Sequence, residues 1–169
     1  MHQRAASLIV IASVAIAAVG IAQTWQAPIR RAGYWEQTVA MTGARARTMT
    51  THYCTDTAME KQFSAFGQGP NARMCSQREM HRTATGMAFN SVCTMGGRTM
   101  TTSGVATGDF QTHFHIETTM HSTPPMPGMG EQTVSMDGKW LGPCPPGRKP
   151  GDMVMEGGQV VNIGAMTPH

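Results

Sequence analysis

Histidine, glutamate and methionine side chains gather in one stretch of the chain and could together bind a metal ion. Side chains two residues apart on a strand share a face and lie about 7 Å apart, so alternating imidazoles could share an ion. Imidazole and thioether ligands together suit copper, which proteins meet outside the cytoplasm. The candidate ligands are His113, His115, Glu117, His121, Met126 and Met129.

The same residues have a second interpretation that needs no metal ion. A strand with one face in the core and one in water carries polar side chains on its wet face. Methionine fills irregular cores and loops, and a chain poor in leucine and isoleucine uses it in their place. On this interpretation we expect no cofactor, and we expect His113, His115 and Glu117 to be exposed. The side chains expected on the buried face are Phe110, Phe114, Ile116 and Met120.

Four cysteines are the second feature with chemistry. An even number in an exported chain is typical of disulfides, and free or metal-bound thiols are the alternative. Cys54 ends one expected strand and Cys75 begins the next, so the segment between them would close naturally on itself. We predict a Cys54–Cys75 bond. By elimination Cys93 pairs with Cys144, which is one of the three pairings that four cysteines allow.

Arrangements suited to catalysis are poorly represented. A nucleophilic serine or cysteine needs a histidine that a carboxylate orients, and Ser64 and Ser103 have no flanking motif of that kind. Most carboxylates lie in or beside expected turns, and no glycine pair precedes a helix as in a phosphate-binding loop. The sequence therefore predicts a protein that is not an enzyme.

The first residues have the pattern of a secretory signal. Arg4 supplies a basic start, and no charge occurs from Ala5 to Ala22. A basic start, an apolar run and small residues such as Gly20 define a signal peptide. An uncleaved anchor is the alternative, although alanine and glycine make the run weakly apolar. We predict cleavage after Ala22 and a periplasmic or secreted protein with no stable membrane span.

The composition narrows the choice of partners. The net charge is +3, and the basic residues are scattered with few aromatic residues between them, which argues against a nucleic-acid surface. Large aliphatic residues are scarce after the leader, so the core should be thin and disulfides should help to stabilise it.

Short alternating runs separated by glycine, proline and aspartate fill the chain from Gly33 onward. A period of two predicts strands that bury one face. Gly96-Gly97 is a hairpin turn signal, Gly108-Asp109 marks another turn, and Asp137-Gly138 suggests a bulge or a tight bend. The expected strands are 34–41, 48–54, 76–83, 87–95, 98–107, 110–121 and 131–141.

One stretch breaks this alternation. Residues 56–66 hold apolar side chains at helical spacing, with Thr55 or Asp56 as the cap, and predict one short helix. The whole pattern predicts an all-β fold, an antiparallel meander of about seven strands that is open or curls into a partial barrel. We divide the chain into a signal (1–22), a linker (23–32), a disulfide-linked β domain (33–144) and a Pro/Gly-rich irregular tail (145–169).

Several short motifs occur in a recognisable order. They are Gly33-Tyr34-Trp35-Glu36, Tyr53-Cys54-Thr55, Cys75, Cys93 and Lys139-Trp140-Leu141-Gly142-Pro143-Cys144. Together they resemble a bacterial family named domain of unknown function 3617, and the segment after Cys144 departs from its pattern. The resemblance implies export, two disulfides and a β fold, and it brings no catalytic residues.

We therefore expect an exported β domain that has a structural role in the cell envelope or binds an envelope partner or a small apolar ligand. A periplasmic copper protein is the alternative. Partial barrels can hold an apolar ligand at their mouths, although the same side chains could instead fill the core solidly. The side chains expected to line such a site are Trp35, Tyr53, Met87, Phe89, Phe110 and Phe114.

Overall fold

The computed structural model describes residues 28–43, 46–63, 74–125 and 131–166. They form nine strands, one helix α1 (Thr57–Phe63) and a 3-10 turn (Ile163–Met166). The strands are β1 (Gly33–Met41), β2 (Arg47–Thr55), β3 (Cys75–Arg82), β4 (Gly86–Met95), β5 (Arg98–Gly108), β6 (His113–Thr123), β7 (Gln132–Gly142), β8 (Asp152–Val154) and β9 (Val160–Asn162). The predicted signal peptide lies outside the described residues.

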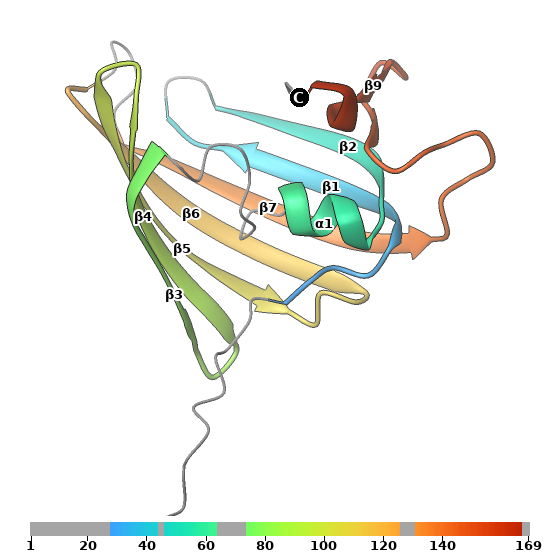
Figure 1. Cartoon of the computed structure of the whole chain (residues 1–169), viewed down its shortest axis with the longest axis horizontal. Coiled ribbons are helices and arrows are strands. Elements are labelled where there is room, and N and C mark those ends of the chain that lie inside the picture. Colours follow the sequence, from blue (N-terminus) through green and yellow to red (C-terminus); the bar gives the residue numbers. More distant parts are fainter. Residues whose placement is uncertain (1–27, 44–45, 64–73, 126–130, 167–169) are drawn as a thin grey trace, which may run out of the picture.

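All nine strands belong to one antiparallel sheet in the order β3-β4-β5-β6-β7-β1-β2-β8-β9. The sheet is strongly curved, and α1 lies over its concave side (Figure 1). The two edge strands, β3 and β9, do not pair with each other, so the sheet does not close into a barrel. The expected all-β antiparallel fold is confirmed. No helix among the described residues is long and apolar enough to cross a membrane.

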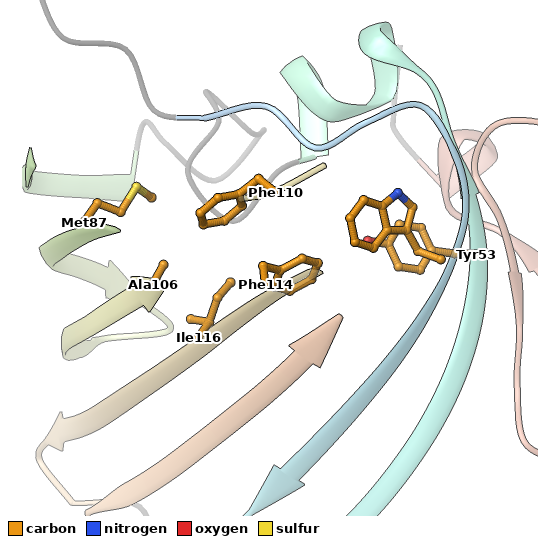
Figure 2. Packing of buried hydrophobic residues seen from close by; sticks show 7 residues of the cluster. Tyr53, Met87, Ala106, Phe110, Phe114 and Ile116 are labelled. Carbon is orange, nitrogen blue, oxygen red and sulfur yellow. The ribbon is translucent and has the colours of Figure 1, made fainter. Parts of the chain in front are cut away.

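The concave side of the sheet, called the inner face below, carries the core. Partners in antiparallel register share a face, so one row of side chains can be followed from strand to strand. The row across β2, β1, β7, β6, β5 and β4 is Met49, Val39, Met136, Ile116, Ala106 and Met87. The core lies at one end of this face, where the rings of Phe110, Phe114 and Tyr53 gather inside the curve of the sheet (Figure 2).

Two glycines of the inner face make room for aromatic rings. A Cβ atom at Gly138 would overlap the ring of Phe114, and one at Gly104 would overlap the ring of Phe89. The expectation of a bulge at Asp137-Gly138 is wrong, because both residues pair regularly with β1 and β6. The irregularity between β1 and β7 lies instead next to Trp35. Glycine at position 138 accommodates a ring, and it does not mark a bend.

Strand β6 begins at His113, three residues later than the expected start at Phe110, because a turn precedes it. Phe110 has a positive φ of 56°, so it belongs to the turn, yet its side chain is buried in the core. The Asp109 carboxylate accepts hydrogen bonds from the backbone N–H groups of Gln111 (2.8 Å), Thr112 (2.8 Å) and His113 (3.1 Å). These bonds from Thr112, His113 and Gln111 lower the pKa of Asp109 well below its usual value.

Helix α1 follows β2 directly. The Asp56 carboxylate accepts a hydrogen bond of 2.8 Å from the backbone N–H of Met59, which confirms Asp56 as the cap. The helix ends at Phe63, and residues 64–66 of the predicted helix lie outside the described residues.

The segment expected to be an irregular tail contains the last two strands. Strand β8 pairs with β2 and β9 pairs with β8, so the tail widens the sheet. The Asp152 carboxylate accepts hydrogen bonds from the Lys149 backbone N–H (2.8 Å) and the Asn162 side-chain amide (2.8 Å). Three-residue strands are too short for alternation to reveal them, which is why the sequence pattern missed them.

The four cysteines form two disulfides, and the predicted pairing is wrong. Cys54 bonds to Cys144 and Cys75 bonds to Cys93. Strands β2 and β7 both pair with β1, so the end of β2 and the end of β7 lie together at the start of β1. Cys75 lies on the far edge of the sheet, directly opposite Cys93 in register. The prediction assumed that Cys54 bonds to the next cysteine along the chain, Cys75. The order of the strands in the sheet keeps these two residues apart.

Candidate functional site

Methionine and histidine are segregated between the two faces of the sheet. The register places every methionine of the described strands on the inner face. They are Met41, Met49, Met80, Met87, Met95, Met100, Met120, Met136 and Met153. The histidines of the described strands all lie on the opposite, outer face, and they are His52, His81, His113, His115 and His121.

The expected exposure of the β6 histidine face is confirmed. His113, Glu117 and His121 are exposed, while Phe114 and Ile116 on the other face are buried. His115 is half-exposed, and its Nδ1 lies 2.7 Å from Asp137 Oδ1.

The proposed metal ligands are therefore not brought together among the described residues. The four candidate ligands on β6 all face outward, and no group of three histidine, cysteine, aspartate or glutamate side chains in the described ranges could hold a metal ion. Met126 and Met129 lie outside the described residues. Copper binding stays a prediction.

The inner face is packed at one end and half-exposed at the other. Trp35 and Phe114 are 0% and 2% exposed, and the segment before β1 lies against both of them, with Trp35 Nε1 donating a hydrogen bond to Arg31 O and the Arg30 guanidinium lying over the Phe114 ring. Further from this end, several side chains of the face are only half-buried, and we call this group the open part of the inner face. It comprises Met41, Phe89, Met100, Thr102, Thr118, Met120 and Val134.

A pocket of about 220 Å³ lies between α1 and the inner face. Its apolar walls come from four elements, and its polar lining comes from the sheet, α1 and the segment before β1. The apolar lining residues are Met59, Met136, Met153 and Ile163. The polar ones are Arg30, Gln37, Tyr53, Thr55 and Glu60. Met136 also belongs to the row that runs across the sheet, so the pocket adjoins the rest of the inner face.

A buried polar network forms one side of this pocket. Glu60 of α1 is 2% exposed, and its carboxylate accepts hydrogen bonds from Arg30 Nε (2.8 Å) and Thr55 Oγ1 (2.8 Å). Arg30 also donates from Nη1 to the Tyr53 hydroxyl. A buried carboxylate is tolerated when it is paired and hydrogen-bonded in this way. The network joins α1 to β2 through the segment before β1.

The aromatic rings around Arg30 complete the arrangement. Its guanidinium carbon lies 5.0 Å from the centre of the Tyr53 ring and 5.3 Å from that of Phe114. Burial raises the pKa of the Tyr53 hydroxyl, and the positive charge of Arg30 opposes this shift only in part. Tyr53 therefore keeps its proton at neutral pH and can donate a hydrogen bond while it accepts one from Arg30.

The side-chain amide of Gln37 has no hydrogen-bond partner among the described residues. Gln37 is half-buried on β1, two residues before Val39 and on the same face, and it lines the pocket. The pocket thus offers a hydrogen-bonding group that none of the described residues uses.

Sequence reasoning identified some of these residues and missed others. Six aromatic and methionine side chains were expected either to line a ligand site or to fill the core. Of these six, only Tyr53 lines the pocket, and all but Phe89 belong to the buried cluster, with Phe89 packed against it. They are Trp35, Tyr53, Met87, Phe89, Phe110 and Phe114. Arg30 and Glu60 were missed. Arg30 falls in the expected linker, and Glu60 stands next to Lys61 in a short helix, where a charged pair ordinarily faces water.

Comparison with known proteins gives a family and nothing finer. A model of the family described as protein of unknown function (DUF3617) matches residues 30–144. No curated protein and no solved structure matches the chain. The matched range includes Arg30, all of β1 to β7 and both disulfides, and it stops before β8.

Proposed function

The chain belongs to the DUF3617 family, and from the chemistry of its inner face we propose that it is an exported, non-catalytic domain that binds an aliphatic chain. The observation that carries the proposal is the segregation of side chains between the two faces of one sheet. A sheet that only filled a core would bury its whole apolar face, and here Met41, Val134 and Met120 stay half-exposed on that face.

The shape of the surface favours a narrow occupant. The inner face is concave and α1 lies over part of it, so a flat protein surface could not reach its floor (Figure 1). Methionine side chains are flexible and polarizable, which suits contact with a chain that has many conformations. The mouths of β-barrels are common sites for small ligands, and a curved open sheet offers a related concave surface.

Export is supported by the basic and apolar pattern at the start of the sequence and by the two disulfides. Disulfides persist in oxidising compartments such as the periplasm and the exterior. The occupant would then be an aliphatic molecule of the cell envelope.

Two neighbouring residues of β5 provide a matched test. Thr102 lies half-buried on the open part of the inner face, whereas Ser103 is exposed on the outer face. The probe is the uncharged dye N-phenyl-1-naphthylamine, whose fluorescence rises in apolar surroundings, and hexadecan-1-ol is the competitor. We expect the wild type to bind the dye and hexadecan-1-ol to displace it.

Thr102→Trp should weaken dye binding about tenfold or more, a loss of about 1.4 kcal/mol, because the indole would occupy the space above the open part of the inner face. Ser103→Trp should bind like the wild type. Equal binding by Thr102→Trp and the wild type, or no binding by the wild type, would contradict the proposal. A dimer of the wild type that Thr102→Trp dissociates would also contradict it, since a second copy of the chain would then be the occupant.

A further inference from the structure

We propose that the pocket beneath α1 holds the polar end of the aliphatic ligand and that this end carries no net charge, as in a long-chain alcohol or a monoacylglycerol. This inference rests on the proposed function and adds the class of ligand. It starts from the fact that the pocket combines apolar walls with a hydrogen-bonding side at the covered end of the inner face.

The charges in the pocket are already matched. Arg30 Nε lies 2.8 Å from Glu60 Oε2, and both side chains line the pocket. Among the described residues, no other cationic or anionic side chain lines it. A ligand carboxylate would meet an arginine that Glu60 has neutralised, and it would lie near the Glu60 carboxylate itself. Burying a charge without a free partner is costly, so the pair disfavours a charged end.

The hydrogen-bonding capacity that remains is that of neutral groups. Gln37 offers an amide oxygen and an amide NH₂ that have no partner among the described residues. Tyr53 accepts from Arg30 and keeps its own O–H to donate. A hydroxyl both donates and accepts, so an alcohol could bond to Gln37 and Tyr53 together.

The walls of the pocket lead from this polar side toward the rest of the inner face. Met136 lines the pocket and is also the register partner of Val39 and Ile116 on the inner face. A ligand with its hydroxyl near Gln37 could therefore lay its chain past Met136 toward the open part of the inner face. One end of the molecule would be fixed by hydrogen bonds, and the chain would be held by apolar contact.

A comparison of two ligands with the same chain length tests the charge argument. Hexadecan-1-ol and hexadecanoate are titrated separately into the wild type and into Glu60→Gln at neutral pH, with displacement of the dye as the readout. We expect the wild type to bind the alcohol about tenfold more tightly than the carboxylate, which corresponds to about 1.4 kcal/mol. Glu60→Gln leaves Arg30 without its anion, so hexadecanoate should gain affinity and the preference should shrink or reverse.

A second variant guards against poor folding of Glu60→Gln, whose side chain is buried. Gln37 is half-buried, and Gln37→Leu replaces its amide by an apolar side chain of similar size. It should weaken hexadecan-1-ol several-fold and leave N-phenyl-1-naphthylamine, which has no hydroxyl, unchanged. The matched control is Thr38→Leu, one residue further on β1 and on the outer face.

The outcomes separate this inference from the proposed function. If neither ligand displaces the dye, both ideas fail. If both ligands bind the wild type equally well and neither Glu60→Gln nor Gln37→Leu changes the ratio, the chain-binding function stands and the uncharged polar end is wrong. A wild type that prefers hexadecanoate contradicts the inference directly.

Discussion

The two faces of the sheet are built from the same strands, and they differ in the chemistry that they present. The outer face carries the strand histidines with carboxylates beside them, such as His115 with Asp137 and His52 with Glu36. The inner face carries the strand methionines, a packed core at one end and half-buried apolar side chains at the other. The alternation of histidine with apolar residues along β6 therefore builds two surfaces of different chemistry, one on each face of the sheet.

This difference bears on where function is sought. The histidine cluster attracts attention in the sequence because imidazoles are reactive, yet the described histidines lie on an open and solvated surface. The less conspicuous strand methionines are gathered by the curvature of the sheet into one concave surface. On this surface, Gly138 and Gly104 let the rings of Phe114 and Phe89 lie against the backbone.

The largest loss of stability is expected from removing the Cys54–Cys144 disulfide, which lies at the end of the inner face that α1 covers. Cys54–Cys144 spans 90 residues and Cys75–Cys93 spans 18. On the chain-entropy model, replacing the first pair by serine should lower the free energy of unfolding by about 4.6 kcal/mol, and replacing the second pair by about 3.2 kcal/mol. Urea unfolding of the two double variants measures both values. A greater loss at the Cys75–Cys93 edge would mean that the covered end does not depend on its disulfide in this way.

A pair of neighbours on β6 compares the two faces directly. Ile116 is 6% exposed on the inner face, and Glu117 is exposed on the outer face. Ile116→Ala should cost about 2–5 kcal/mol of stability because it leaves a cavity in the core. Glu117→Ala should stay within about 0.5 kcal/mol of the wild type. Equal losses in thermal unfolding would show that the faces are not distinct.

A methyl group added at Gly138 should have a smaller effect. Gly138→Ala places a Cβ atom where the Phe114 ring lies, so the ring must move, at a cost of about 1–3 kcal/mol. Lys139→Ala, next along β7 and exposed, is the control and should change stability little. Unfolding in urea distinguishes the two variants, and a stabilised Gly138→Ala would refute this account of the glycine.

The smallest effect concerns pH and the turn before β6. The pKa of Asp109 is lowered in the folded state, so its contribution to stability is present above the unfolded pKa of about 3.9 and is lost as the pH falls toward the folded value. Asp109→Asn should therefore be less stable than the wild type at neutral pH, and the difference should shrink as the pH falls below about 4. Urea unfolding across this pH range measures the difference. A constant gap would mean that the charge of Asp109 does not matter.

The local patterns predicted most of the strands and their faces. Strict alternation in β6 was sufficient to place Phe114 inside and His113 outside, because a shift of one residue would bury imidazoles. Asp56 was identifiable as a helix cap, and Gly96-Gly97 as the turn between β4 and β5.

Features that depend on long-range pairing could not be predicted in this way. The Cys54–Cys144 bond follows from the pairing of β7 with β1, which joins segments about 100 residues apart and leaves no local trace. The same holds for β8 on β2, and for the contact of Arg30, in the segment before β1, with Glu60 of α1. Residues such as Gln37 gain their place in the pocket only once α1 is docked.

The central claim is that the inner face, and not the outer face, receives an aliphatic ligand. Methionine methyl groups labelled with ¹³C report on this face, because the described strands carry methionine nowhere else. Addition of hexadecan-1-ol should shift the NMR signals of Met41, Met120 and Met136, assigned by substitution with leucine. The signal of Met74, which is 38% exposed and precedes β3, should stay in place. Unchanged signals from Met41, Met120 and Met136 at saturating ligand would contradict the claim.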